Sequence, residues 1–192
     1  MDRRSKRLML TGQAIFYEPD AISADAAACG IVSDVSLSGL TGGVLTVAAQ
    51  PDYPRALRCV LTDADGSITG GTVTLVGVDA NGEGITDVVT FTGAGTVDGV
   101  KAFAKLTSAT WALTGGSVTE TDDKIAIGLA KALGLPSAPG ATFERLIKAT
   151  YDGGDEAGTL NTTYGTYTPA GTLDASDEVE VLYLFSVPLD VF

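Results

Sequence analysis

A run of alternating apolar and polar residues on either side of Asn81-Gly82 most constrains the fold. It reads GTVTLVGVDANGEGITDVVTFTG over residues 71–93. Asn-Gly between two alternating runs is the strongest short-range signal for a β-hairpin, because both residues tolerate positive φ. The apolar positions of the two expected strands are Val73, Leu75, Val76, Ile85, Val88, Val89 and Phe91.

Further strands are expected on the C-terminal side of this hairpin. GVKAFAKLTSATWAL (99–113) and DKIAIGLAKAL (123–133) are two of them, and GLAKALGL (128–135) is the one stretch that also fits a short helix. Residues 141–160 fit a strand, an acidic glycine turn and a second strand, and EVEVLYLFSV (178–187) alternates cleanly. Strands separated by turn signals every 8–12 residues predict an all-β fold, an antiparallel β-sandwich or barrel.

The chain divides into an arm and a body. Residues 1–47 are weakly patterned and are expected to form an extended N-terminal arm, whereas residues 48–192 form the β-sandwich body, with 141–192 as a candidate C-terminal β subregion. QPDYPR (50–55) marks the entrance to the body, because its two prolines favour a stiff, extended backbone. We expect Tyr53 to fix the chain in place where the arm enters the body, and Arg55 to lie at the rim of this entrance.

Charge is unevenly distributed along the chain. The net charge is −12, yet four of the twelve basic residues are Arg3, Arg4, Lys6 and Arg7. Without these four and Asp2, residues 8–192 hold 8 basic and 23 acidic residues, a charge of −15. A body this acidic repels nucleic acid and anionic membranes, so we expect neither as a partner of the body. No apolar run is long enough for a membrane span, and the polar residues 11–13 argue against a signal peptide.

Composition argues against common catalytic chemistry. The chain has no histidine, the most frequent general base and metal ligand, and we expect neither a catalytic site nor a cofactor. Carboxylate pairs such as Asp122-Asp123 fit a solvated surface, although composition alone leaves a two-carboxylate glycosidase open. The two cysteines, Cys29 and Cys59, are expected to be reduced and unpaired. Trp111 and the pair Tyr164/Tyr167 are expected in a core or an interface.

Glycine-rich and acidic stretches resemble ligand loops only in composition. Four glycine pairs lack the Lys-Ser/Thr of a phosphate-binding loop and are expected to be turns: Gly42-Gly43, Gly70-Gly71, Gly115-Gly116 and Gly153-Gly154. DADG (63–66) and DANGEG (79–84) fail as EF-hand loops, because their twelfth positions are Thr74 and Thr90 rather than glutamate. We expect turns with no metal, and a weak Ca²⁺ site in either turn stays open.

Short motifs spread over residues 50–187 give the chain a resemblance. In order they are QPDYPR, the 71–93 hairpin, GVKAFAKLTSATW, KALGLP (131–136) and YGTYTPAGTLDASDEVEVLYLF (164–185). Together they resemble a group of virion structural proteins of tailed bacteriophages. That resemblance implies an Ig-like β-sandwich, a capsid decoration or cement role beside the major capsid protein or other virion proteins, and assembly in the host cytoplasm into the virion. It carries over no catalytic residue.

The expected function is therefore structural rather than enzymatic. Decoration of the major capsid lattice by a homo-oligomer is the first expectation, and a tail-tube or head–tail connector subunit is the alternative. A carbohydrate-binding or adhesive module is less favoured, since aromatic residues are only 7% of the chain. The residues expected to contact partners are Arg3, Arg4, Lys6, Arg7, Tyr53 and the apolar terminal residue Phe192.

Overall fold

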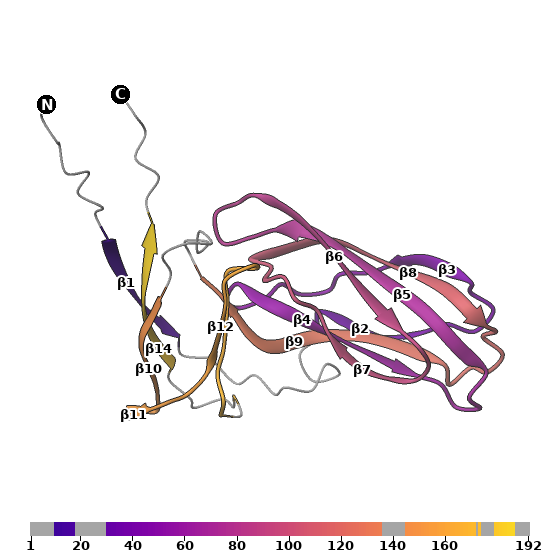
Figure 1. The fold of residues 1–192 in the computed structure, drawn as a ribbon. Helices are drawn as coiled ribbons and strands as arrows, with labels where there is room; N and C mark the ends of the chain where they lie inside the picture. Colours follow the sequence, from indigo (N-terminus) through magenta and orange to yellow (C-terminus); the bar gives the residue numbers. More distant parts are fainter. Residues whose placement is uncertain (1–9, 18–29, 136–144, 172, 174–178, 187–192) are drawn as a thin grey trace, which may run out of the picture.

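The protein is built from antiparallel β-sheets (Figure 1). The structure is a computed structural model that describes residues 10–17, 30–135, 145–171, 173 and 179–186. These ranges contain no helix, and hence none with the length and apolarity to cross a membrane. The strands are β1 (Leu10–Tyr17), β2 (Val32–Ser36), β3 (Gly42–Leu45), β4 (Arg55–Thr62), β5 (Ile68–Val78), β6 (Gly84–Phe91), β7 (Gly95–Asp98), β8 (Lys105–Gly116), β9 (Lys124–Gly134), β10 (Arg145–Tyr151), β11 (Gly154–Asp155), β12 (Thr159–Asn161), β13 (Thr166–Thr168) and β14 (Val179–Ser186). The all-β expectation is confirmed.

The hairpin predicted around Asn81-Gly82 is the β5–β6 pair. Its register runs from Gly71↔Phe91 to Val78↔Gly84, and Gly82 adopts a φ of 81° in the turn. With β8 and β3 it makes sheet C, in the order β3-β8-β5-β6. The alternation places one set of apolar side chains in the core and leaves Val76 and Val88 exposed on the other face.

Sheet B is organised around β9. It has the order β12-β13-β9-β4-β7, and β2 also pairs with β9. The stretch GLAKALGL, which fitted either a helix or a strand, lies mostly in β9, where it is buried on both faces. A strand covered on both faces loses its alternation, which explains why its sequence pattern was ambiguous.

Sheets B and C pack face to face around an apolar cluster that we call the sandwich core. It contains inward side chains of β4 and β9 from sheet B and of β5, β6 and β8 from sheet C. Trp111 of β8 is 1% exposed and meets Phe91 of β6 edge to face, with ring centroids 6.5 Å apart. Trp111 therefore fills the core, as expected.

The prediction that the glycine pairs are turns is wrong for three of them. Gly42-Gly43 lies in β3, Gly70-Gly71 in β5 and Gly115-Gly116 at the end of β8. A Cβ added to Gly71 would lie 1.9 Å from the Trp111 ring, so the strand must lack a side chain there for the indole to fit. Glycine serves close packing at this position rather than chain reversal.

The boundary expected at residue 47 is also wrong for the described part of the arm. β2 pairs with β9 in sheet B and β3 pairs with β8 in sheet C. Ile31, Val32, Leu37 and Leu45 are at most 4% exposed in the sandwich core. Both strands are short and bury few side chains, so their sequence shows little periodicity although the sandwich includes them.

Sheet A carries a second buried cluster, which we call the tyrosine core. Its strand order is β1-β14-β10-β11, and it lies beside the sandwich in Figure 1. The predicted alternation of β14 is confirmed, since Val179, Val181 and Tyr183 are at most 2% exposed. The members of the tyrosine core are Leu133, Leu135, Ala149, Tyr167, Leu173, Val179, Val181 and Tyr183. Because Leu133 belongs to β9, one strand runs through both cores.

Candidate functional site

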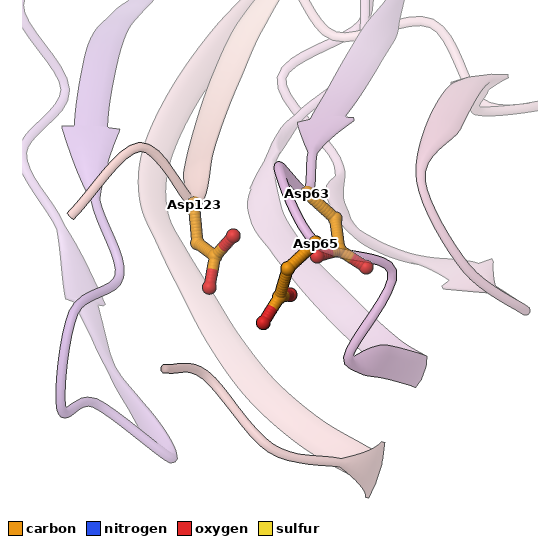
Figure 2. A group of neighbouring side chains, drawn as sticks. All are labelled: Asp63, Asp65 and Asp123. Atoms are coloured by element: carbon orange, nitrogen blue, oxygen red, sulfur yellow. The ribbon is translucent and has the colours of Figure 1, made fainter. Parts of the chain in front are cut away.

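Three aspartates meet at one end of the sandwich (Figure 2). Asp63 and Asp65 follow β4, and Asp123 directly precedes β9. β4 and β9 are antiparallel neighbours with Thr62 opposite Lys124, so the end of one strand lies beside the start of the other. One carboxylate oxygen from each residue lies within 4.8 Å of the others.

Asp63 organises the turn that joins β4 to β5. Its Oδ1 accepts hydrogen bonds from the amides of Gly66 (3.0 Å) and Ser67 (3.3 Å), and its Oδ2 accepts one from Ile68 (3.0 Å). Gly66 has a φ of 74°, as a tight turn requires. These contacts agree with the prediction that DADG is a turn.

Asp123 is buried, which corrects the expectation of a solvated carboxylate pair. It is 0% exposed, while Asp122 is exposed. Its Oδ1 accepts the amide of Ala64 (3.1 Å), and its Oδ2 accepts those of Thr119 (3.2 Å) and Glu120 (3.1 Å). A buried carboxylate needs such donors. Two come from the residues just before Asp123, and the third comes from the Asp63 turn, which the local sequence does not show.

Asp65 links the turn to the loop before β9. It accepts hydrogen bonds from the Ser67 amide (2.9 Å) and the Thr119 hydroxyl (2.7 Å). Hydrogen bonds from Ser67 and Thr119 lower the pKa of Asp65 to about 2. Oxygen ligands of this kind suit a hard cation such as Ca²⁺. Amide and hydroxyl donors already occupy the oxygens of all three carboxylates, so we assign the cluster the structural role of joining two loops.

Asp79 shapes the other acidic turn in the same way. Its Oδ1 accepts the amides of Asn81 (2.8 Å) and Glu83 (2.9 Å). The carboxylate therefore caps the β5–β6 hairpin turn, in agreement with the turn prediction.

A surface hollow lies beside this turn. It has a volume of about 220 Å³ and is lined by Asp79, Ile85, Lys101, Ala102, Thr163 and Tyr164. Ligand pockets usually enclose roughly 300 to 1,000 Å³. The Lys101 ammonium donates to the Thr86 carbonyl oxygen at 2.7 Å, and Tyr164 is 43% exposed at the rim. The hollow is too small to argue for a substrate site.

Tyr53 is the one predicted partner-contact residue that the structure describes, since Arg3, Arg4, Lys6, Arg7 and Phe192 lie outside the described residues. Tyr53 is half-buried and packs against the tyrosine core. Burial, with a smaller contribution from Tyr183, raises the pKa of its hydroxyl to about 12. Much of its side chain is thus used inside the molecule, at the point where the chain enters β4.

Arg55 is buried rather than at the rim, so that expectation is wrong. It is 1% exposed, and its Nε and Nη2 donate to the carbonyl oxygen of Ala130 at 2.9 and 2.7 Å. The β4–β9 register shifts between Arg55 and Leu57, and the guanidinium bonds to a β9 carbonyl at this irregularity. Asp52 lies 3.8 Å from Arg55 Nη1. Arg55 therefore stabilises the part of β9 that connects the two cores.

The middle of the outer face of sheet C combines several strands into one uncharged surface, which we call the neutral face. The exposed Lys105, opposite Val78, lies at its end. One row across the sheet is Val44, Thr110, Thr74 and Val88, matched by register. Val44 is 79% exposed and Val88 54%. All residues of the neutral face are exposed or half-buried, and they are Gly42, Val44, Thr72, Thr74, Val76, Thr86, Val88, Thr90, Ser108, Thr110 and Ala112.

Sequence reasoning found the alternation in these strands but not the neutral face. The pattern TVTLV shows which side chains share a face, whereas the pairing of β3 and β8 with β5 decides which faces join. The missing signal is strand order, which a single sequence does not supply.

No protein-family model, curated protein or solved structure matches the chain. Its function is therefore inferred from its own residues.

Proposed function

We propose that the protein is a structural component of a tailed-bacteriophage virion that decorates the capsid, with the neutral face lying on the lattice of the major capsid protein. The motifs that resemble phage virion proteins correspond to β5–β6, β8, the end of β9 and β14. The all-β fold is of the class that this resemblance implies.

The observation that carries the proposal is the absence of charge on the neutral face. None of its eleven residues is charged, although residues 8–192 carry a net charge of −15. Charged residues are depleted in the centres of protein interfaces, because burying an unpaired charge is costly. A protein partner can thus lie on the neutral face without burying an unpaired charge of this chain.

The size of the neutral face favours repeated binding. Four strands about 4.8 Å apart, over about five residues of about 3.3 Å each, give an area of roughly 300 Å². A stable pairwise interface buries roughly 800 Å² on each partner. A single copy would bind weakly through this face, whereas linked copies on a repeating lattice gain affinity from effective concentration.

The test is binding of the purified protein to capsid shells of the phage that encodes it. The double variant Thr74→Glu/Val88→Glu places two charges at the centre of the neutral face. Sedimentation of shells with bound protein should show at least a tenfold loss of affinity.

The matched control is Thr96→Glu, on exposed β7 of the opposite sheet. It adds the same kind of charge away from the neutral face and should bind as the unmodified protein does. Equal binding by all three proteins, or equal loss in both variants, would contradict this docking surface.

A further inference from the structure

The strand β1 leaves one backbone edge open. It pairs with β14 over its whole length, from Leu10↔Ser186 to Tyr17↔Val179, without a register shift. It is the terminal strand of sheet A, and no other strand of the described residues pairs with it. In Figure 1, the N-terminal end of β1 and the C-terminal end of β14 point away from the sandwich.

The sequence of β1 lacks the features that usually protect an edge. LTGQAIFY contains no charged residue and no proline. Natural sheets protect exposed edges with lysine, proline, bulges or very short strands, because an unpaired row of N–H and C=O groups recruits another strand. The other terminal strands are two to five residues long, except β6, which carries Asp87 and contacts β7.

We propose that β1 pairs antiparallel with β1 of a second copy of this chain. The two sheets A then join into one continuous sheet across a two-fold axis. The N–H and C=O groups on the open edge of each β1 form hydrogen bonds with those of the other. This interface is separate from the neutral face and does not depend on the proposed capsid role.

The charges that flank β1 in the sequence select this partner and this orientation. Arg3, Arg4, Lys6 and Arg7 precede the strand, and the next basic residue after it is Arg55. Glu18 and Asp20 follow the strand directly. In an antiparallel pair, the basic end of each strand meets the acidic end of the other, whereas a parallel pair would bring like charges together. Another copy of this chain supplies both the neutral strand and the complementary ends.

The first readout is the mass of the purified protein, measured by light scattering over a concentration series. We expect a monomer–dimer equilibrium in the absence of any capsid. The orientation is then tested with single cysteines placed in turn at Thr11, Gln13, Ala14 and Phe16, in a Cys29→Ser background, followed by oxidation.

Antiparallel pairing brings a residue close to its own copy only near the two-fold axis. We therefore expect disulfide-linked dimers at one or two adjacent positions and at least tenfold less at the others. The control is Val44→Cys on β3, an exposed residue of another terminal strand, which should stay uncrosslinked.

Three results would overturn the proposal. The first is crosslinking at every β1 position, because that indicates parallel pairing. The second is crosslinking of Val44→Cys in place of the β1 variants. The third is a monomer at all concentrations together with no crosslinking of any β1 variant. None of these results bears on binding to capsid shells through the neutral face, which the shell-binding experiment tests separately.

Discussion

The sandwich core and the tyrosine core are buried to a similar degree but are built from different side chains. Among the residues whose burial the structure describes, the sandwich core has nineteen members, and the aromatic ones are Phe91, Phe103 and Trp111. The tyrosine core has eight such members, of which Tyr167 and Tyr183 are fully buried, and Tyr53 and Tyr151 pack against it. The smaller cluster removes less apolar surface from water, so it depends more on the strand that it shares with the sandwich.

The difference in side chains changes what each core requires. Aliphatic side chains need only complementary shape, whereas a buried tyrosine hydroxyl also needs a hydrogen-bond partner. Tyr167 donates to Glu156 Oε1 at 2.9 Å. The sandwich core is therefore most sensitive to changes in volume, and the tyrosine core to changes in polar contacts.

The largest effect is expected at the connection between the two cores. Arg55→Ala removes a buried guanidinium and leaves the Ala130 carbonyl without its donor, so we expect unfolding free energy to fall by about 3 kcal/mol or more. Urea denaturation measures this change. Arg58→Ala is the control, because its ion pair with Asp98, at 2.6 Å, is partly exposed and should be worth less than about 1 kcal/mol. Similar losses in both variants would show that Arg55 has no special role.

A smaller loss is expected from added volume in the sandwich core. Gly71→Ala places a methyl group 1.9 Å from the Trp111 ring, and we expect a loss of about 2 to 3 kcal/mol. Gly43→Ala in β3 meets nothing within 4 Å and should change stability by less than about 0.5 kcal/mol. Tryptophan fluorescence during denaturation follows both variants. A tolerated Gly71→Ala would mean that the indole does not occupy this position.

Removing one polar contact tests the tyrosine core. Tyr167→Phe keeps the ring but loses the hydrogen bond to Glu156, so we expect a loss of about 1.5 kcal/mol. Tyr164→Phe, at a 43% exposed position, should be close to neutral. Thermal denaturation of the two variants compares them. Equal stability would show that the Tyr167 hydroxyl contributes nothing.

The smallest effects are expected from alkaline pH. Burial raises the pKa of Cys59 in the sandwich core from 9.0 to about 12, with Asp87 and Asp98 contributing less. Tyr53 rises from 10.0 to a similar pKa beside the tyrosine core. A raised pKa favours the neutral group in the folded state, so its stabilisation is complete below the unfolded pKa and is lost as pH rises towards 12.

Melting temperature should accordingly decline above about pH 9. Cys59→Ala should reduce the decline in melting temperature that begins near pH 9. Tyr53→Phe should reduce the further decline that begins near pH 10. Melting curves from pH 7 to 11.5 separate the two contributions. Identical slopes in the parent and both variants would contradict these pKa assignments.

Long alternating strands could be predicted from the sequence, and short ones could not. The β5–β6 hairpin and β14 follow from periodicity, because every second residue enters a core. β2 and β3 have only four or five residues with one buried position each, so they resemble an arm. Their place in the sandwich depends on pairing with distant strands, and local sequence does not encode that pairing.

The candidate site shows the same limit. That Asp63 forms a turn could be predicted from DADG, because aspartate and glycine favour turns locally. The burial of Asp123 and Arg55 could not be predicted, since each has a hydrogen-bond partner in a distant loop or strand. Ala64 is 59 positions from Asp123, and Ala130 is 75 positions from Arg55. The requirement for glycine at position 71 could not be predicted either, because it comes from the Trp111 ring that packs against this position.

The central claim, that this protein decorates a capsid lattice, is tested most directly by its copy number in purified virions. Quantitative mass spectrometry against the major capsid protein gives the ratio of the two chains. The account predicts a copy number that approaches the count of capsid subunits. About six or twelve copies per particle, the number in a single ring of a connector, would contradict it, as would absence of the protein from the virion.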